Sequence, residues 1–366
     1  MRYVFISYIK SDKFNDPMVW LKRIEMYSGI LHQLALIGEV HSIEQINYEG
    51  RFCKDNVDYH FKIYKKRSLK YFPIRLHQYV KQLKPDIVFV NGLHFPLQTI
   101  LLRLQLGRKV KIILQHHAEL PFKGVRKFLQ ISCSFFANAY LFASKAIGME
   151  WVERGNIYSA IKIYEVMEVS SVFFPVNKEN ALLKTGIIGN PTYLWVGRLN
   201  KNKNPLLALK SFLIFLETCP FARLYMIYQT TELLREIELV LEKSNYKNSI
   251  ILIGKIPHEE MLYWFNSADF IISSSYYEGS GTAVCEAMSC GCIPIVTNIH
   301  SFTMITENGK AGILYDVGNC ESLLMALKQS PLINREMVKA KVLRYYESTL
   351  SFKAIASQIH FIAQSL

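Results

Sequence analysis

The sequence lacks a long uninterrupted hydrophobic run. Its best apolar stretch, residues 131–143, is 13 residues long and contains Asn138, whereas a helix that spans a bilayer needs about 20. The first ten residues have neither the apolar length nor the small-residue cleavage site of a signal peptide. The sequence therefore predicts no transmembrane helix and no leader, and we expect a cytoplasmic protein.

Cysteine is sparse and scattered, with seven residues in 366. Cys290 and Cys292 are separated by one glycine between a predicted helix and an apolar strand, and no second Cys or His cluster at ligand spacing accompanies them. Two interpretations stay open. The pair forms part of a buried core, which we favour, or it is a metal or redox pair. Scattered cysteines are typical of a reducing compartment.

Acidic residues are outnumbered by basic ones in the first half of the chain. Residues 1–184 hold 27 Lys and Arg but 15 Asp and Glu, whereas residues 185–366 hold 16 and 15. The excess is concentrated between Arg51 and Lys84. Such a basic region has three interpretations. It is a solvated face, it contacts an anionic membrane or an acidic acceptor, or it binds nucleic acid. No nucleic-acid-binding motif accompanies the charges, so we predict no nucleic-acid partner.

Apolar residues, by contrast, make up 50% of the chain, enough for two cores of roughly 150–200 residues each. Short apolar runs alternate with amphipathic stretches of helical length, the pattern of parallel sheets with helices on both faces. The expected strands are Tyr3–Tyr8, Phe61–Tyr64, Asp86–Val90, Val110–Gln115, Tyr140–Ala143, Tyr193–Val196, Leu224–Tyr228, Ile250–Ile253, Phe270–Ser273 and Ile293–Thr297.

The fold class predicted from this alternation is α/β, with two Rossmann-like, doubly wound domains. The join falls within Asn177–Pro191, where Pro, Asn and Gly cluster. We expect a first domain over residues 1–180 and a second over residues 181–350. The amphipathic segment 351–366 follows the final strand, and we expect it to pack back on the first domain.

One candidate site lies in Ser273–Thr297, which reads SSSYYEGSGTAVCEAMSCGCIPIVT. An expected strand ends in a loop with Gly279 and Gly281, and a helix begins near Thr282. Glycines let the backbone approach a ligand, and the first N–H groups of a helix attract an anion such as a diphosphate. Glu278 and Glu286 could accept hydrogen bonds from sugar hydroxyls. The alternative is an ordinary surface loop.

A second candidate site is Tyr193–Pro205, YLWVGRLNKNKNP. An expected strand runs into Gly197 and Arg198, and Lys201 and Lys203 follow before a helix begins at Pro205. Cations at the carboxyl end of a parallel strand lie where open α/β sheets bind ligands, and Arg and Lys both suit phosphate. Taken alone, these residues are equally consistent with solvated loop charges.

The two stretches together resemble the retaining glycosyltransferases of family 4, which have the GT-B fold with two domains facing a central cleft. The shared pattern is Gly-Arg-Leu with a Lys five residues after the Arg, then Glu-Gly-x-Gly-x-x-x-x-Glu-Ala-Met-x-x-Gly. The matching positions are Gly197, Arg198, Leu199, Lys203, Glu278, Gly279, Gly281, Glu286, Ala287, Met288 and Gly291. Weaker similarity extends over Gly254–Asp269 and Ser351–Phe352.

This resemblance implies roles for particular residues. Arg198 and Lys203 would hold the donor diphosphate and balance its charge, and Gly197 precedes them. Glu278 would contact the transferred sugar, and Glu286 the ribose. The remaining donor contacts would come from the loop and helix start at Gly279, Ser280, Gly281 and Thr282, and from Lys255 and Ile256 near the base.

In the first half, Lys111–Glu119 reads KIILQHHAE, an expected strand that ends in two histidines. The resembling families often place a His there, near the transferred sugar, and His117 aligns better than His116. A structural role for either histidine is the alternative. Two departures from the family concern this half: the loop after the first strand contains no glycine, and Met167-Glu168-Val169-Ser170 stands where Asn-Gly-Val-Asp is usual.

The resemblance predicts a retaining glycosyltransferase that moves a hexose-type sugar from a UDP- or GDP-sugar. The acceptor would be a saccharide or a lipid-linked saccharide in cell-surface polysaccharide or lipopolysaccharide synthesis, and the basic first domain would contact an anionic membrane peripherally. No Asp-x-Asp motif occurs, so we expect no metal and no other cofactor. A nucleotide-sugar epimerase or hydrolase on the same scaffold and a non-catalytic nucleotide-sugar-binding protein remain alternatives.

Overall fold

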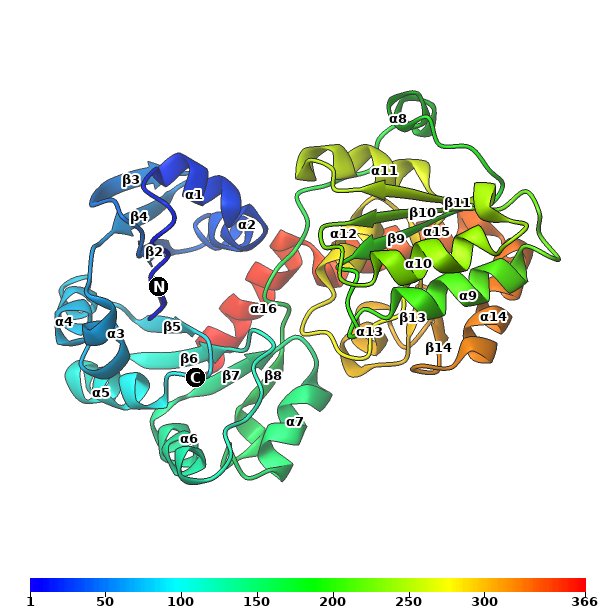
Figure 1. The fold of residues 1–366 in the computed structure, drawn as a ribbon. Helices are drawn as coiled ribbons and strands as arrows, with labels where there is room; N and C mark the ends of the chain where they lie inside the picture. Colours follow the sequence, from blue (N-terminus) through cyan, green and yellow to red (C-terminus); the bar gives the residue numbers. More distant parts are fainter. The chain divides into compact units, whose positions relative to one another are not determined.

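The computed structural model describes residues 1–366, and the chain folds into two compact units. Unit 1 consists of Met1–Ser170 and Phe352–Leu366, and unit 2 consists of Ser171–Ser351 (Figure 1). Each unit is an α/β structure built around a parallel sheet, as the alternation of apolar runs and amphipathic stretches predicted.

The chain passes from unit 1 to unit 2 ten residues before the expected boundary at residue 180. The segment after Ser170 belongs to unit 2 because Phe173 packs in its core and the backbone N–H of Val176 donates to Oδ1 of Asn266 at 2.8 Å. Helix α16 (Phe352–Ser365) lies in unit 1, where Nδ1 of His360 is 2.6 Å from the hydroxyl of Tyr3.

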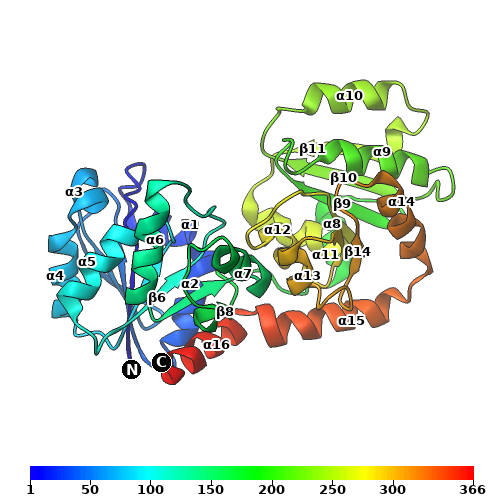
Figure 2. The same ribbon diagram turned by 90° about the horizontal axis from the view of Figure 1, so that it is seen from below.

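Unit 1 contains an eight-stranded sheet in the order β3-β4-β2-β1-β5-β6-β7-β8, parallel except between β3 and β4. Val4 on β1 faces a core shared with α3–α7. Its neighbours Tyr3 and Phe5 face the opposite way, toward α16 and α2. Helices therefore cover both faces (Figure 2).

The remaining elements of unit 1 are β1 (Arg2–Ile6), α1 (Pro17–Arg23), α2 (Glu25–Leu34), β2 (Glu39–Glu44), β3 (Gly50–Lys54), β4 (Val57–Phe61), α3 (Lys66–Tyr71), α4 (Ile74–Gln82), β5 (Ile87–Asn91), α5 (Pro96–Leu106), β6 (Lys111–Gln115), α6 (Val125–Phe136), β7 (Ala139–Phe142), α7 (Lys145–Glu153) and β8 (Ile163–Glu165).

Unit 2 contains six parallel strands in the order β11-β10-β9-β12-β13-β14. Numbered within the unit, this order is 3-2-1-4-5-6, that of a doubly wound dinucleotide-binding sheet. Its elements are α8 (Lys178–Thr185), β9 (Thr192–Gly197), α9 (Pro205–Phe215), β10 (Arg223–Tyr228), α10 (Leu234–Glu242), β11 (Ile250–Gly254), α11 (Met261–Ser267), β12 (Phe270–Ser273), α12 (Thr282–Ser289), β13 (Ile293–Thr297), α13 (His300–Ile305), β14 (Ile313–Tyr315), α14 (Cys320–Gln329) and α15 (Arg335–Tyr345).

One expected strand, Phe61–Tyr64, is wrong. The strand in this part of the chain is β4, which ends at Phe61, and its neighbour β2 was not predicted. β2 does not show the apolar pattern of a buried strand in the sequence, because two of its buried residues, His41 and Ser42, are polar. Nδ1 of His41 lies 3.0 Å from Nε2 of His60 on β4, so polar side chains satisfy one another across two buried strands.

No helix combines the length and the apolar composition needed to cross a bilayer. All seven cysteines are free thiols. Cys290 and Cys292 lie in the core of unit 2, and burial raises the pKa of Cys290 to about 12. No cluster of three or more His, Cys, Asp or Glu side chains is arranged to hold a metal ion, so the core interpretation of this pair agrees with the structure.

Candidate active site

The two motif-bearing loops of unit 2 follow adjacent strands. β9 and β12 are neighbours in the sheet, and the strand order reverses between them. Ligands of open α/β sheets bind outside the carboxyl ends of the strands at such a switch point. The loop after β9 carries Arg198–Asn204, and the loop after β12 carries Ser274–Gly281. The fold therefore brings together two segments that are about 75 residues apart in sequence.

Hydrogen bonds fasten these two loops to each other. The backbone N–H of Tyr276 donates to the carbonyl of Asn202 at 2.8 Å, and Nδ2 of Asn202 donates to the carbonyl of Tyr277 at 2.9 Å. Below them, the Ser274 hydroxyl donates to the carbonyl of Lys203 at 2.8 Å and accepts from Nε1 of Trp195 at 3.2 Å. These hydrogen bonds hold the backbone of both loops, from which the charged side chains of Lys203 and Glu278 project.

The charged residues predicted for the donor site lie on this surface. Nζ of Lys203 forms an ion pair with Oε1 of Glu278, and the Ser275 hydroxyl donates to the same oxygen at 2.6 Å. Arg198 is exposed directly after β9. Lys203, Glu278 and Arg198 thus lie on loops at the carboxyl ends of β9 and β12. An ammonium group and a guanidinium can bind a phosphate group, and a carboxylate can bind the hydroxyls of a polyhydroxy compound.

Helix α12 begins directly after Gly281, at the end of the β12 loop. Gly281 is difficult to replace by any other residue. Gly281 has φ +63°, and a Cβ at this position would lie 2.6 Å from Cε1 of Phe302. Gly279 and Ser280 before it are buried, and Thr282 is the first helical residue. The first N–H groups of α12 have no preceding turn to bond to, so this end of the helix favours an anion.

Glu286 lies one turn into α12 and is buried. Nε2 of His258 lies 2.7 Å from Oε1 of Glu286. His258 follows Lys255 and Ile256 at the end of β11, so this contact joins the expected base-binding segment to the expected ribose-binding carboxylate. Sequence reasoning did not single out His258, although its position just beyond the Gly254–Ile256 segment was an available signal.

Unit 1 has its own cavity of about 870 Å³ at the carboxyl ends of β1, β2, β5 and β6. β1 and β5 are neighbours where the strand order of this unit reverses. The cavity is largely apolar, and its aromatic lining residues are Phe5, Phe14, Trp20, Tyr27 and Phe95. Its position and chemistry are those of a ligand pocket.

The two histidines after β6 have different environments. His116 is buried, its ring stacks on Phe142 with centroids 4.7 Å apart, and Nε2 lies 3.0 Å from the carbonyl of Glu119. Burial lowers the pKa of His116. His117 instead lines the cavity of unit 1. The structure therefore assigns His116 to the core and His117 to a surface that a ligand can reach.

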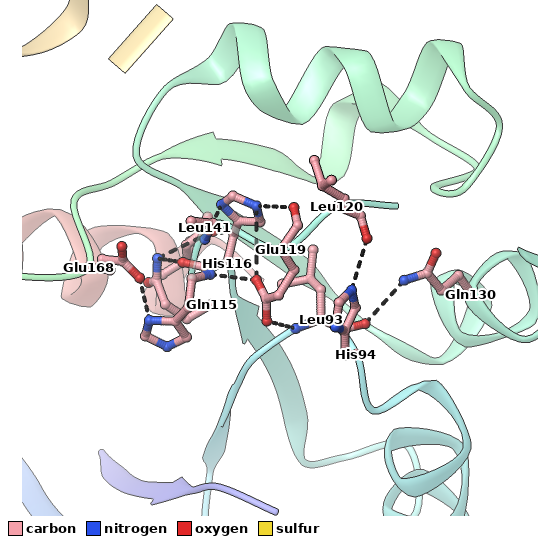
Figure 3. Close-up of polar contacts among 11 residues, drawn as sticks. Leu93, His94, Gln115, His116, Glu119, Leu120, Gln130, Leu141 and Glu168 are labelled. Carbon is pink, nitrogen blue, oxygen red and sulfur yellow. Dashed lines mark hydrogen bonds and ion pairs between the residues drawn. The ribbon is translucent and has the colours of Figure 1, made fainter. Parts of the chain in front are cut away.

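Two carboxylates, those of Glu119 and Glu168, contact His117, and both are labelled in Figure 3. Oε2 of Glu119 accepts from the backbone N–H of His117 at 2.6 Å, and Oε1 accepts from Leu93 N–H at 2.8 Å. Nδ1 of His117 forms an ion pair with the buried Glu168. Burial alone lowers the pKa of His117, but the contact with Glu168 and the charges of Glu168 and Glu119 outweigh it, so the pKa is raised.

A further carboxylate in this cavity was not predicted. Glu44 lies at the end of β2, where its oxygens accept from Nε1 of Trp20 at 2.8 Å and from the Ser42 hydroxyl at 2.6 Å. Burial raises the pKa of Glu44. No sequence pattern marked it, because β2 itself escaped prediction.

Comparison with known proteins finds a family model that matches part of the second half of the chain. Residues 178–339 match the family described as glycosyl transferases group 1. We refer to this matched segment as the group 1 domain. The match covers both motif-bearing loops, β11 and α12, so the group 1 domain contains all the residues predicted to bind the donor.

Two curated relatives are glycosyltransferases by name. The D-inositol 3-phosphate glycosyltransferase of Corynebacterium jeikeium is 25% identical over 139 residues, which cover 36% of this chain and 32% of the relative. The O-antigen chain mannosyltransferase B of Escherichia coli is 29% identical over 91 residues, which cover 25% of this chain and 23% of the relative. The chain thus spans at most about a third of the length of these two relatives.

Solved structures resemble the whole chain. Anabaena Alr3699/HepE, determined in complex with UDP, matches with a TM-score of 0.74 and 12% identity over 100% of both chains. The fold is therefore GT-B, as predicted.

Proposed function

We propose that this protein is a glycosyltransferase whose group 1 domain binds a nucleotide diphosphate-sugar. The observation that supports the proposal is the meeting of the β9 and β12 loops, in which Lys203 pairs with Glu278. Arg198 directly follows β9, and α12 begins at Thr282 after the β12 loop. Glu286, held by His258, completes the site on the same helix. The family match over residues 178–339 supports the same reading.

In this proposal the donor is a UDP- or GDP-sugar and the transferred group is a hexose. Arg198 and Lys203 bind the diphosphate, and the amides from Gly279 to Thr282 add hydrogen bonds to its oxygens. Glu278 accepts from the hydroxyls of the sugar and Glu286 from those of the ribose. Lys255 and Ile256 lie beside the base. The UDP in the HepE structure supports a uridine nucleotide as the first to test.

We propose that transfer retains the anomeric configuration. The acceptor hydroxyl oxygen forms the new bond to C1 on the face from which the diphosphate departs. The C1–oxygen bond to phosphate breaks and its electron pair leaves with the nucleoside diphosphate, and a phosphate oxygen takes the acceptor proton. Arg198, Lys203 and the amides of α12 meet the developing charge, each contributing a few kcal/mol, so no metal is required.

The acceptor, in this proposal, binds in the unit 1 cavity with His117 at its edge. Aromatic walls with the Glu44 carboxylate between them suit the apolar and hydroxyl-bearing faces of a saccharide. We infer a saccharide or lipid-linked saccharide in cell-surface polysaccharide or lipopolysaccharide synthesis, on the cytoplasmic side of the membrane. The O-antigen relative supports this pathway class.

Calorimetric titration with UDP, GDP and their sugars, without added metal, tests the donor site. We expect micromolar binding of one nucleotide, weakened at least tenfold by Arg198→Ala and by Glu286→Ala, because each removes one charged contact worth about 1.5–3 kcal/mol. Failure of every nucleotide to bind would end the proposal. Product released without any acceptor would indicate an epimerase or hydrolase instead, and an inverted product by NMR would refute retention.

A further inference from the structure

Four helices on one face of unit 1 carry no carboxylate. They are α3, α4, α5 and α6, and they pack against one another in contacts of α5 with α3, α4 and α6 (Figure 2). Residues 66–136 hold 13 Lys and Arg but only two acids, Asp86 and Glu119, both outside these helices. Asp86 accepts from the backbone of Arg2 and Glu119 from that of Leu93. The outer surface of α3–α6 therefore carries cations without acids, whereas α7, which packs on the same core, carries Glu150 and Glu153.

Helix α6 on this face is apolar on its exposed side. Its buried residues are Gln130, Cys133 and Ser134, whereas Val125 is 83% and Phe128 is 69% exposed. Phe128 and the exposed Phe135 are seven residues apart, a spacing that places both on one side of a helix. Packing on the sheet does not explain this side, since the larger apolar residues point away from the core.

The same composition continues over the neighbouring helices. Leu104 on α5 is 70% exposed, and Phe72, which joins α3 to α4, is 66% exposed. Cations lie among these apolar side chains at Lys70, Arg75 and Arg126, all exposed. We call this surface, the exposed residues of α3–α6 with Phe72, the basic apolar face.

We propose that the basic apolar face docks unit 1 on a bilayer that contains anionic lipid, with Val125 and Phe128 inserted among the acyl chains. Bulky apolar side chains bordered by Lys and Arg, without acids, match the boundary between anionic headgroups and acyl chains. Exposed apolar clusters of this kind mark interaction surfaces. A membrane contact at Arg51–Lys84 was one interpretation of the sequence, and the proposal extends it to α5 and α6, with Val125 and Phe128 as anchors.

Co-sedimentation of the full chain with vesicles tests this assignment. The vesicles are phosphatidylcholine alone or phosphatidylcholine with about 30 mol% phosphatidylglycerol, in about 0.1 M salt. We expect binding only to the anionic vesicles. Phe128→Ser should weaken partitioning about tenfold, because it withdraws one aromatic side chain from lipid, and Arg75→Glu with Arg126→Glu should weaken it by a similar or larger factor.

Phe221→Ser is the matched control, since Phe221 is equally exposed, at 75%, but lies in unit 2. It should leave vesicle binding unchanged. Far-ultraviolet circular dichroism and thermal unfolding should show that all variants fold like the parent, as expected for exposed sites. No binding to anionic vesicles, or equal losses in Phe128→Ser and Phe221→Ser, would overturn the proposal.

Nucleic acid is the competing partner of a basic face. If single-stranded RNA bound at the same salt and displaced the vesicles, and Phe128→Ser left RNA binding intact, the face would be a nucleic-acid site and the membrane assignment would be wrong. The proposal rests on the surface of unit 1 alone. It can therefore stand or fall independently of sugar transfer, which the nucleotide titration tests in unit 2.

Discussion

Units 1 and 2 place their polar residues differently at the same point of the same architecture. Where the strand order reverses in unit 2, charged side chains stand on two loops that hydrogen-bond to each other. Where it reverses in unit 1, aromatic residues surround a cavity of about 870 Å³. A phosphate site needs glycine, a helix start and a few cations, which leave a readable sequence pattern. A cavity lined by aromatic side chains from many loops leaves none.

Their surfaces differ in the same way. The helices α8, α10, α14 and α15 of unit 2 each carry residues of both charge signs, whereas α3–α6 of unit 1 carry only cations. Mixed charge suits a helix layer in water. A helix layer that carries only positive charge and exposes aromatic side chains suits a partner with a negatively charged surface and an apolar interior. Under the proposed function, unit 2 would bind the donor, and unit 1 would contact the acceptor and the membrane.

The largest effect that this division predicts is the loss of Lys203. Lys203→Ala removes a cation from the place where charge develops on the leaving diphosphate, so sugar transfer should fall about 10²–10³-fold. Steady-state kinetics of sugar transfer to an acceptor measures it. Lys201→Ala is the control, because Lys201 is an exposed cation in the same loop. If both variants kept most of the activity, the catalytic role of this loop would be refuted.

A second test asks whether the start of α12 depends on steric fit as well as on backbone conformation. Gly281 and Gly186 have nearly the same φ, +63° and +65°, but only Gly281 has a neighbour that a Cβ would strike. Alanine should cost about 1–2 kcal/mol at either position for the left-handed backbone, and about 1–3 kcal/mol more at Gly281. Urea unfolding of both variants measures the difference. Equal costs would mean that Phe302 moves aside freely.

Much of unit 2 could be predicted from sequence because its signals are local. The helix expected to begin near Thr282 starts at that residue in the structure and runs to Ser289, since a glycine loop and an apolar strand delimit it. In unit 1 the signals are not local. The apolar run 131–143 comprises the end of α6 and all of β7, and nothing in the run says that Phe135 faces outward. β2 was missed because its buried His41 finds its partner on another strand.

Glu168 shows how a departure from a family pattern can become informative once distances are known. In the sequence it stood in place of a glycine and carried no assigned role. In the structure it is the partner of His117, a residue that lines the cavity of unit 1, and this contact raises the pKa of His117. The pairing could not be predicted, because about 50 residues and two helices separate the two side chains.

The smallest predicted effect concerns this pair, and it should appear in unit 1 alone. Glu168→Gln removes the charge that outweighs burial, so the pKa of His117 should fall. Because the pKa of His117 is raised in the folded state, the pair stabilises the protein fully below the unfolded value of about 6.5. This contribution is lost as the pH rises through the folded pKa. The difference in unfolding free energy between parent and variant should therefore be larger at about pH 6 than at about pH 9.

NMR titration of the imidazole signals, with His117→Asn to assign them, measures the pKa of His117 directly. The charged and titratable groups around it are Glu168, Glu119 and His116, so Glu119→Gln should shift the same signal less than Glu168→Gln, since Glu119 acts only through its charge. Nucleotide binding in unit 2 should stay unchanged in both variants. An unchanged pKa in Glu168→Gln would show that Glu168 does not raise the pKa of His117. The contrast between an apolar cavity with one carboxylate-paired histidine and a loop site with several charged side chains would then have to be redrawn.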